Sequence, residues 1–295
     1  YWGYRGMGGT HDDAALRAAS AMEFFQAAAL LHDDVMDGSD TRRGMPSAHR
    51  AAAFTHADAG WSGDSDRFGE ATAILAGDLC LQWTDELYAT SGLPTDHLQR
   101  GRETFDRMRT QLMGGQFLDV LESARGWDGM STAERVTSAR RVIRFKSAKY
   151  TIEAPLLIGA LAGGIAPEAA AALSTYGLAL GEAFQLRDDL LGVFGDPVHT
   201  GKPAGDDLRE GKRTVLVAYT LDAASPPEQD ILQSALGNPS LTSAQVGDVR
   251  TLMEGSGAVA RVEADITNLA AAAHQALGTV RAAVDPTAYQ VLNDL

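Results

Sequence analysis

Apolar residues recur every three to four positions along most of the chain, which is the spacing of helices that bury one face. The stretches with this period are 12–37, 68–90, 95–123, 131–165, 167–194, 212–223, 226–237, 242–253 and 257–283. No run of four or more residues alternates cleanly between apolar and polar positions, so the pattern gives no sign of β-strands. It predicts an all-α fold of eight or more helices, packed as a bundle in a single domain over 1–295.

Composition supports this prediction and limits the function. Alanine, the strongest helix former, accounts for 49 of the 295 residues. The formal net charge of −14 gives a long-range field that repels nucleic acid and anionic membranes. The longest apolar stretch, 154–166, is too short to span a bilayer, and the single cysteine, Cys80, fits a reducing compartment. We therefore expect a cytoplasmic protein with no transmembrane segment that binds no nucleic acid.

The end of the first long stretch carries three aspartates. Asp33 and Asp37 are four positions apart, so they lie on one face of a helix, and Asp34 flanks them. They directly follow the apolar run 27–31. Because negative charge at a helix C-terminus opposes the macrodipole, a solvated acidic turn is the less favoured interpretation. The cluster predicts a site that holds a cation.

A second aspartate pair, Asp188-Asp189, closes another apolar helix, with Gln185 one turn before it. Two such clusters on separate helices predict facing carboxylates around several Mg²⁺ ions, because Mg²⁺ prefers hard oxygen ligands. Basic residues follow each cluster, namely Arg42 and Arg43 after the first and Lys202, Lys212 and Arg213 after the second. Carboxylates that hold Mg²⁺ beside Arg and Lys can bind a diphosphate.

On these residues the chain resembles the trans-isoprenyl diphosphate synthases, which add five-carbon units head to tail. The resemblance covers nearly the whole chain: 33–44 match the first aspartate-rich motif of the family, 184–197 match the second, and Lys146-Ser147 matches the Lys-Thr/Ser pair between them. It implies a large helical bundle of about ten or more helices around a deep central cavity, and a homodimer.

The resemblance also implies a reaction. Three Mg²⁺ ions, held by Asp33, Asp37 and Asp188 with Asp34 and Asp189 beside them, would draw off the diphosphate of an allylic substrate. Isopentenyl diphosphate would then attack the allylic carbocation. The other positions that match the family are Arg42, Lys146, Lys202 and Lys212 for the allylic diphosphate, Arg43 and Gln26 for isopentenyl diphosphate, and Ser147, Phe184 and Gln185 for the path of the carbocation. Simple core packing is the alternative for Phe184, and a surface lysine is the alternative for Lys146.

The chain departs from the family pattern at two places. Gly192 stands where the second motif usually has a third aspartate. In addition, the basic Gly-Gly-Lys-Arg-Leu-Arg-Pro motif, which in the family normally lies a short way upstream of the position of Tyr1, is absent from this sequence. We therefore expect the chain to be incomplete at its N-terminus and to carry only part of the subsite for isopentenyl diphosphate.

Product length should depend on the helix that ends in the first cluster. The small residues Ala29 and Ala28 lie four and five positions before Asp33, roughly 6–8 Å down the axis. Phe25 and Phe24 lie roughly 12–14 Å down and could form a floor. This spacing predicts geranylgeranyl diphosphate, with twenty carbons, as the product. The alternative is that both rings pack elsewhere and that another helix, near Cys80 or Met113, sets the floor.

Other functions remain open at this point. A farnesyl or longer-chain synthase would share both motifs. A class I terpene cyclase would share the first motif, but its second usually carries Ser and Glu after the aspartate, which Asp188 lacks. A metal-dependent phosphohydrolase, suggested by His32-Asp33, would need further histidines at defined spacing. A non-catalytic partner subunit commonly loses one aspartate motif, whereas this chain keeps both.

Overall fold

The computed structural model describes residues 1–196 and 205–295, and the described chain is almost entirely helical. Contacts divide it into two compact units. The larger unit contains the described residues of 1–10, 99–195 and 204–295, and the smaller unit contains those of 11–98 and 196–203. None of the described helices is both long enough and apolar enough to cross a membrane. The all-α prediction is confirmed, while the single domain stays a prediction.

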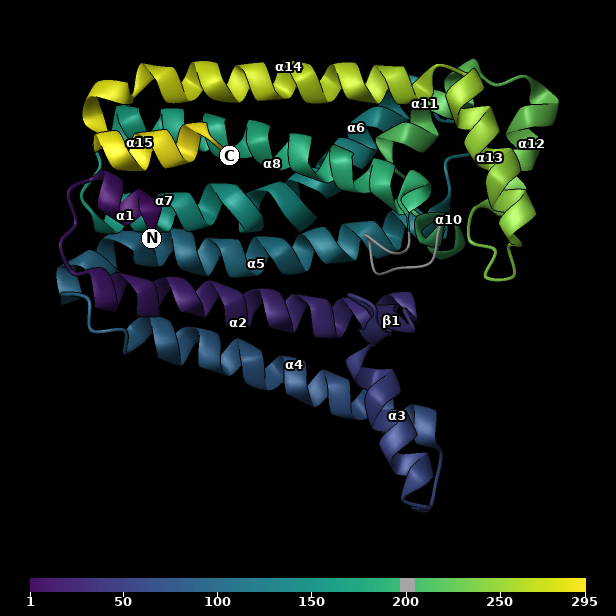
Figure 1. The fold of residues 1–295 in the computed structure, drawn as a ribbon, viewed down its shortest axis with the longest axis horizontal. Coiled ribbons are helices and arrows are strands. Elements are labelled where there is room, and N and C mark those ends of the chain that lie inside the picture. The colour runs from purple at the N-terminus through teal and green to yellow at the C-terminus, as the bar shows by residue number, and fades with distance from the viewer. Residues whose placement is uncertain (197–204) are drawn as a thin grey trace. The chain divides into compact units, whose positions relative to one another are not determined.

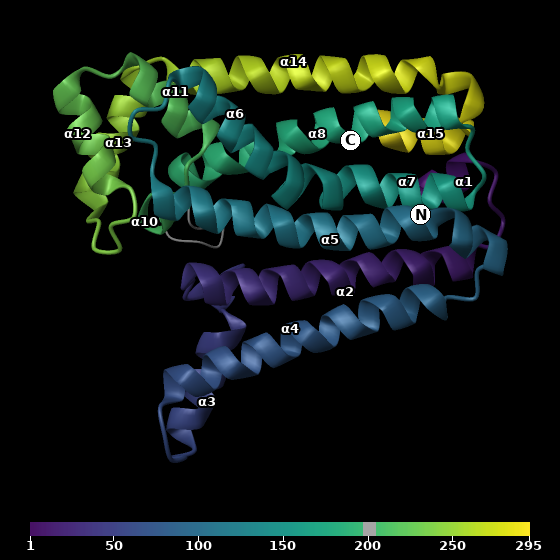
Figure 2. The same cartoon turned by 180° about the vertical axis from the view of Figure 1, so that it is seen from behind.

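The smaller unit is built on two long helices, α2 (Asp12–Asp37) and α4 (Ser65–Ala89), which lie side by side (Figures 1 and 2). Between them the chain forms a two-stranded hairpin, β1 (Thr41–Arg42) and β2 (Met45–Pro46), and helix α3 (Ala48–Asp58), which packs on α4. The bounds of α2 agree with the periodicity. Its C-terminus is set by Gly38, whose left-handed conformation (φ 65°) suits a residue without a Cβ.

The larger unit contains most of α5 (Thr95–Arg125) and the helices that follow it. These are α1 (Trp2–Gly6), α6 (Thr132–Val142), α7 (Ala154–Ala162), α8 (Pro167–Phe194), α10 (Asp206–Glu210), α11 (Val215–Ala223), α12 (Pro226–Ala235), α13 (Ser243–Gly255), α14 (Ala258–Thr279) and α15 (Pro286–Asn293), with a short 3₁₀ helix at Arg281–Ala283. Both views show α14 lying along α8, and these two helices contribute to both apolar cores of the unit (Figures 1 and 2).

The stretch 131–165, predicted as one helix, is divided in the structure. A π-helix, η1 (Ile143–Glu153), separates α6 from α7 and carries Lys146 and Ser147. Its neighbours reach it closely because they present glycines: a Cβ on Gly115 of α5 would overlap the backbone of residues 145 and 146, and one on Gly181 of α8 would press on Ala148. Hydrophobic periodicity alone does not distinguish the π-helix from an α-helix, since the chain keeps a helical path through it.

Candidate functional site

The first group of candidate residues lies at the C-terminal end of α2, in the smaller unit. Asp33 and Asp37 are one turn apart on the same side of the helix, and both remain partly accessible to solvent. Asp34, by contrast, is buried. One carboxylate of the cluster, Asp34, therefore points into the protein, and the other two remain near the surface.

Arg42 is the partner of the buried carboxylate. Its guanidinium donates from Nε to Asp34 Oδ1 at 3.0 Å and pairs with the same oxygen through a second nitrogen, which is also 3.7 Å from Asp33 Oδ2. The hairpin brings Arg42 back over the helix end, because Arg43 and Gly44 both have positive φ (54° and 75°), as a tight two-residue turn requires. Arg42 is thus held in place beside the aspartates, whereas Arg43 is exposed in the turn.

Further up α2, the candidate residues divide between two faces. The ring of Phe24 packs edge to face on Trp83 of α4, with ring centroids 5.8 Å apart, and Nε2 of His32 lies 3.0 Å from the Ile74 carbonyl of the same helix. Phe24 therefore lies on the side of α2 opposite Asp33, nine positions later, which does not favour its predicted place in the floor. Phe25 and Ala28 are buried, while Gln26 and Ala29 are half-buried. His32 also faces α4 rather than the face of Asp33, which does not favour the phosphohydrolase interpretation.

The second group lies at the C-terminal end of α8, in the larger unit. Gln185 donates from Nε2 to both aspartates of the pair, at 3.2 Å to Asp188 Oδ2 and 2.9 Å to Asp189 Oδ1. Asp188 is exposed and Asp189 is buried. Phe184 is 54% exposed, so core packing does not explain it. The Gln185 side-chain amide thus bridges the two carboxylates at the C-terminal end of α8.

Helix α10 adds further charges to this group. Lys212 Nζ lies 2.5 Å from Glu210 Oε2 and 3.4 Å from Asp207 Oδ1. Burial raises the pKa of Asp189 to about 8, and the negative charges of Asp207 and Asp188 add to this effect, while the Gln185 hydrogen bond and Lys212 oppose it. Neither Asp207 nor Glu210 was identified from the sequence, because only the fold brings α10 to α8. The predicted Lys202 lies outside the described residues. Burial lowers the pKa of Arg213, and the negative charge of Asp128 opposes this effect.

A third feature of the larger unit is an ion pair on the π-helix. Lys146 Nζ donates to Asp119 Oδ2 at 2.6 Å, and both side chains are largely buried. Lys146 is therefore not a surface lysine. Ser147, the next residue, is buried. Asp119 lies on α5 one turn after Gly115 and was missed by the sequence analysis, although an aspartate inside the apolar run 117–121 is a signal that could have found it.

The donor set fits Mg²⁺ chemically, because every candidate ligand is a carboxylate, which is a hard oxygen donor. The raised pKa of Asp189 supports this fit, since a cation would relieve the repulsion among Asp188, Asp189 and Asp207. However, within residues 1–196 and 205–295, no three His, Cys, Asp or Glu side chains are already arranged around one point. The structure thus shows negatively charged helix ends rather than a complete coordination shell.

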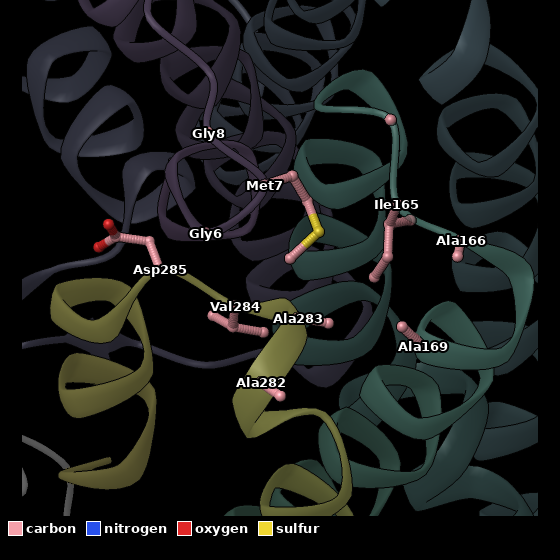
Figure 3. Close-up of a pocket in the computed structure, with 11 residues that line it drawn as sticks. Gly6, Met7, Gly8, Ile165, Ala166, Ala169, Ala282, Ala283, Val284 and Asp285 are labelled. Carbon is pink, nitrogen blue, oxygen red and sulfur yellow. The ribbon is translucent and has the colours of Figure 1, made fainter.

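A pocket of about 500 Å³ lies elsewhere in the larger unit (Figure 3). Small and apolar side chains line it, and its charged residue is Asp285, whose carboxylate accepts hydrogen bonds from the backbone N–H groups that open α15. Ala169 of its wall is near the start of α8, roughly 28 Å along that helix from Asp188. With no basic residue in its lining, this pocket does not suit a diphosphate.

Comparisons with known proteins agree with these features. The profile of the polyprenyl synthetase family matches residues 4–254. A geranylfarnesyl diphosphate synthase of Aeropyrum pernix is 34% identical over 76% of this chain and 64% of its own length. A geranylgeranyl diphosphate synthase of Sulfolobus acidocaldarius is 32% identical over 81% of this chain and 66% of its own length. The chain thus spans slightly less than two thirds of these two relatives.

Solved structures show the same likeness. The crystal structure of geranylgeranyl pyrophosphate synthase from Corynebacterium glutamicum, complexed with isoprenyl diphosphate and magnesium, is 40% identical, with a TM-score of 0.93 over 100% of this chain and 82% of that one. The polyprenyl synthase of Caulobacter crescentus, complexed with calcium and isoprenyl diphosphate, is 30% identical, with a TM-score of 0.79 over 99% of this chain and 79% of that one.

Proposed function

The chain belongs to the polyprenyl synthetase family, and from this premise we propose that it is a prenyltransferase that condenses isopentenyl diphosphate with an allylic diphosphate. The observation that carries the proposal is that acidic helix ends and nearby basic side chains occur together in both units. Arg42 pairs with Asp34 beside Asp33, and Lys212 pairs with Asp207 beside Asp189. A diphosphate with bound cations needs both kinds of charge.

In the proposed reaction, the bond between C1 and oxygen of the allylic diphosphate breaks, giving pyrophosphate and an allylic carbocation. The double bond of isopentenyl diphosphate would attack this carbocation, and the released pyrophosphate would accept the proton whose loss forms the new double bond of a product five carbons longer. Asp33, Asp37 and Asp188 would hold three Mg²⁺ ions. These ions would supply positive charge to the leaving diphosphate.

The basic side chains would bind the substrates and stabilise the leaving group. Arg42, Lys146 and Lys212, together with Lys202, would contact the allylic diphosphate, where developing negative charge favours fixed cations. Asp119 would position Lys146, whose ammonium it binds at 2.6 Å. The contacts of isopentenyl diphosphate would come from Arg43 and Gln26, and the groups along the carbocation would be Ser147, Gln185 and the exposed ring of Phe184.

We propose geranylgeranyl diphosphate as the product, with Phe25 as the floor. The small Ala28 and Ala29 on α2 support a product longer than farnesyl, and the names of the similar enzymes include both geranylgeranyl and geranylfarnesyl synthases. A homodimer and a cytoplasmic location remain predictions.

The test is an elongation assay with Mg²⁺, isopentenyl diphosphate and dimethylallyl, geranyl or farnesyl diphosphate in turn, with products sized by mass spectrometry. A linear diphosphate of twenty carbons supports the proposal. A fifteen-carbon or much longer product keeps the reaction but rejects the floor. A cyclic hydrocarbon formed without isopentenyl diphosphate indicates a cyclase, and no turnover of any starter indicates a non-catalytic subunit.

A further inference from the structure

Glu153, the last residue of the π-helix η1, carries a buried carboxylate for which the proposed reaction has no role. Its Oε1 accepts a hydrogen bond from Ser174 Oγ of α8 at 2.5 Å, and its Oε2 lies 3.3 Å from Lys149 Nζ, four positions earlier on η1. The Glu153 and Lys149 side chains are 10% and 16% exposed, so solvent and salt screen this ion pair only weakly. Glu153 therefore connects the C-terminal end of η1 both to α8 and to the preceding turn of η1.

The backbone of η1 lies against α8 beside the same carboxylate. A Cβ built on Gly177 of α8 would lie 2.7 Å from Glu153 Cα, and one on Gly181 would lie 2.6 Å from Ala148 Cα. The two glycines are four positions apart and share a face of α8. Ala148 and Glu153 are five positions apart, which would place them about 140° apart around an α-helix. The i→i+5 hydrogen bonds of a π-helix bring two such residues to one side. The contact with α8 therefore fits η1 as a π-helix and would not fit an α-helix.

The first half of η1 carries Lys146, whose place depends on the same register. The backbone there packs on α5, where a Cβ on Gly115 would overlap the nitrogen of Lys146. Lys146 Nζ pairs with Asp119, one turn further along α5. Because the two kinds of helix differ in rotation per residue, a return to the α register between Lys146 and Glu153 would turn the lysine around the helix axis relative to Asp119. The direction of the Lys146 ammonium thus depends on a register that is held seven residues away.

We propose that Glu153 is a positioning residue for Lys146: it fastens the end of η1 to α8, keeps the π register and so holds the ammonium where it binds the substrate diphosphate. This inference rests on the proposed function, because that diphosphate is the ligand assigned to Lys146. Glu153 itself contacts neither substrate nor Mg²⁺ in this role, since its two oxygens are engaged by Ser174 and Lys149. Its loss should therefore change ligand affinity only through Lys146.

A double-mutant cycle tests this dependence, with the affinity of inorganic pyrophosphate in the presence of Mg²⁺ measured by isothermal titration calorimetry. Lys146→Ala and Glu153→Ala should each weaken binding by about tenfold. The double variant Lys146→Ala/Glu153→Ala should bind within about twofold of Lys146→Ala alone, because no ammonium is left to misplace. A purely structural role for Glu153 would instead make the two losses multiply.

The control separates a loss of stability from a loss of positioning. Asp285→Ala removes the carboxylate that accepts hydrogen bonds from the first N–H groups of α15. It should lower the urea midpoint of unfolding, as Glu153→Ala also should, but leave the pyrophosphate affinity at the wild-type value. If Glu153→Ala does not fold, Glu153→Gln decides by the same cycle, since it keeps the shape and an acceptor for Ser174, loses the charge opposite Lys149 and should weaken binding about threefold.

The proposal is overturned if the Glu153 variant binds pyrophosphate like the wild type, if Lys146→Ala does so, or if the double variant shows the product of the two single losses. The elongation assay on the wild-type protein separates this proposal from the proposed function. A wild type that elongates while the cycle gives independent losses refutes only the role of Glu153. A wild type that does not elongate refutes the function.

Discussion

The aspartate-bearing ends of α2 and α8 look alike in the sequence but differ in how the fold treats their buried carboxylate. At the end of α2, Asp34 is buried against a cation, the guanidinium of Arg42. At the end of α8, Asp189 is buried beside an amide, Gln185, and near another carboxylate, and its pKa rises to about 8. The buried carboxylate of the first end is thus already paired with a cation, whereas the buried carboxylate of the second gains most from one.

This difference shows that a sequence motif identifies candidate ligands but does not show whether a nearby cation balances their charge. Arg42 follows the first motif by a few residues, so a short hairpin suffices to return it to Asp34. The groups around Asp189 come from α10 as well as from α8, and they include Asp207. We therefore expect the two ends to respond differently when a charge is removed.

The largest effect should come from removing an accessible carboxylate at either end. Asp33→Asn and Asp188→Asn should each lower kcat for elongation by about 10²–10³-fold, because charge stabilisation of the leaving group is lost. The matched control is Asp58→Asn, an exposed aspartate at the C-terminal end of α3, which should leave kcat unchanged. If only one of the two site variants loses activity, the ends do not serve the same reaction.

The next effect concerns stability and should appear at the end of α2. Arg42→Gln removes the partner of the buried Asp34, which should lower the free energy of unfolding by about 3 kcal/mol. Arg43→Gln, the same substitution at the exposed neighbour, should change it by less than about 0.5 kcal/mol. Urea denaturation measures both. Equal losses in the two variants would contradict a structural role for the Arg42–Asp34 pair.

A smaller effect, dependent on pH, should appear at the end of α8. Folded Asp189 keeps its proton up to about pH 8, whereas the unfolded chain releases it near its ordinary pKa of 3.8. Between these values the folded state binds more protons, so this group makes the free energy of unfolding fall as pH rises, by up to about 1.4 kcal/mol per pH unit.

Urea denaturation in EDTA at pH 5, 6 and 7 tests this dependence. Asp189→Asn should remove that part of the slope, and Mg²⁺ with pyrophosphate should reduce it in the wild type. Asp248→Asn, an exposed substitution on α13, should keep the wild-type slope. If Asp189→Asn and the wild type have the same slope, Asp189 does not carry a raised pKa.

The last prediction concerns product length, which should change with the smallest effect on rate. Only a substitution on α2 should cause this change. Phe25→Ala should shift the products beyond twenty carbons, because it removes the proposed floor. Phe24→Ala is the control, since its ring packs on Trp83 and should not limit the chain. Mass spectrometry of the products measures both, and an unchanged product from Phe25→Ala would place the floor elsewhere.

The sequence predicted the parts of the fold and site that depend on local patterns. The bounds of α2 and α8 and the positions of their aspartates follow from helical periodicity and terminating glycines. The π-helix did not follow, because it depends on the close approach of glycines on α5 and α8. Asp119 and Asp207 were also missed, since each interacts with a side chain from another helix, Lys146 and Asp189 respectively. Local signals therefore identify the candidate ligands, whereas the groups beside them are brought in by tertiary contacts.

We propose that the aspartate-bearing ends of α2 and α8 each bind cations of the substrate diphosphate, although only the buried carboxylate of α2 is paired with an arginine. Calorimetric titration of inorganic pyrophosphate into the wild type, Asp33→Asn, Asp188→Asn and Asp58→Asn, with Mg²⁺ and with EDTA, tests it most directly. We predict Mg²⁺-dependent binding that weakens by about tenfold or more in each of the two site variants and is unchanged in Asp58→Asn. Binding that is equal in EDTA, or that survives intact in either site variant, would contradict the account.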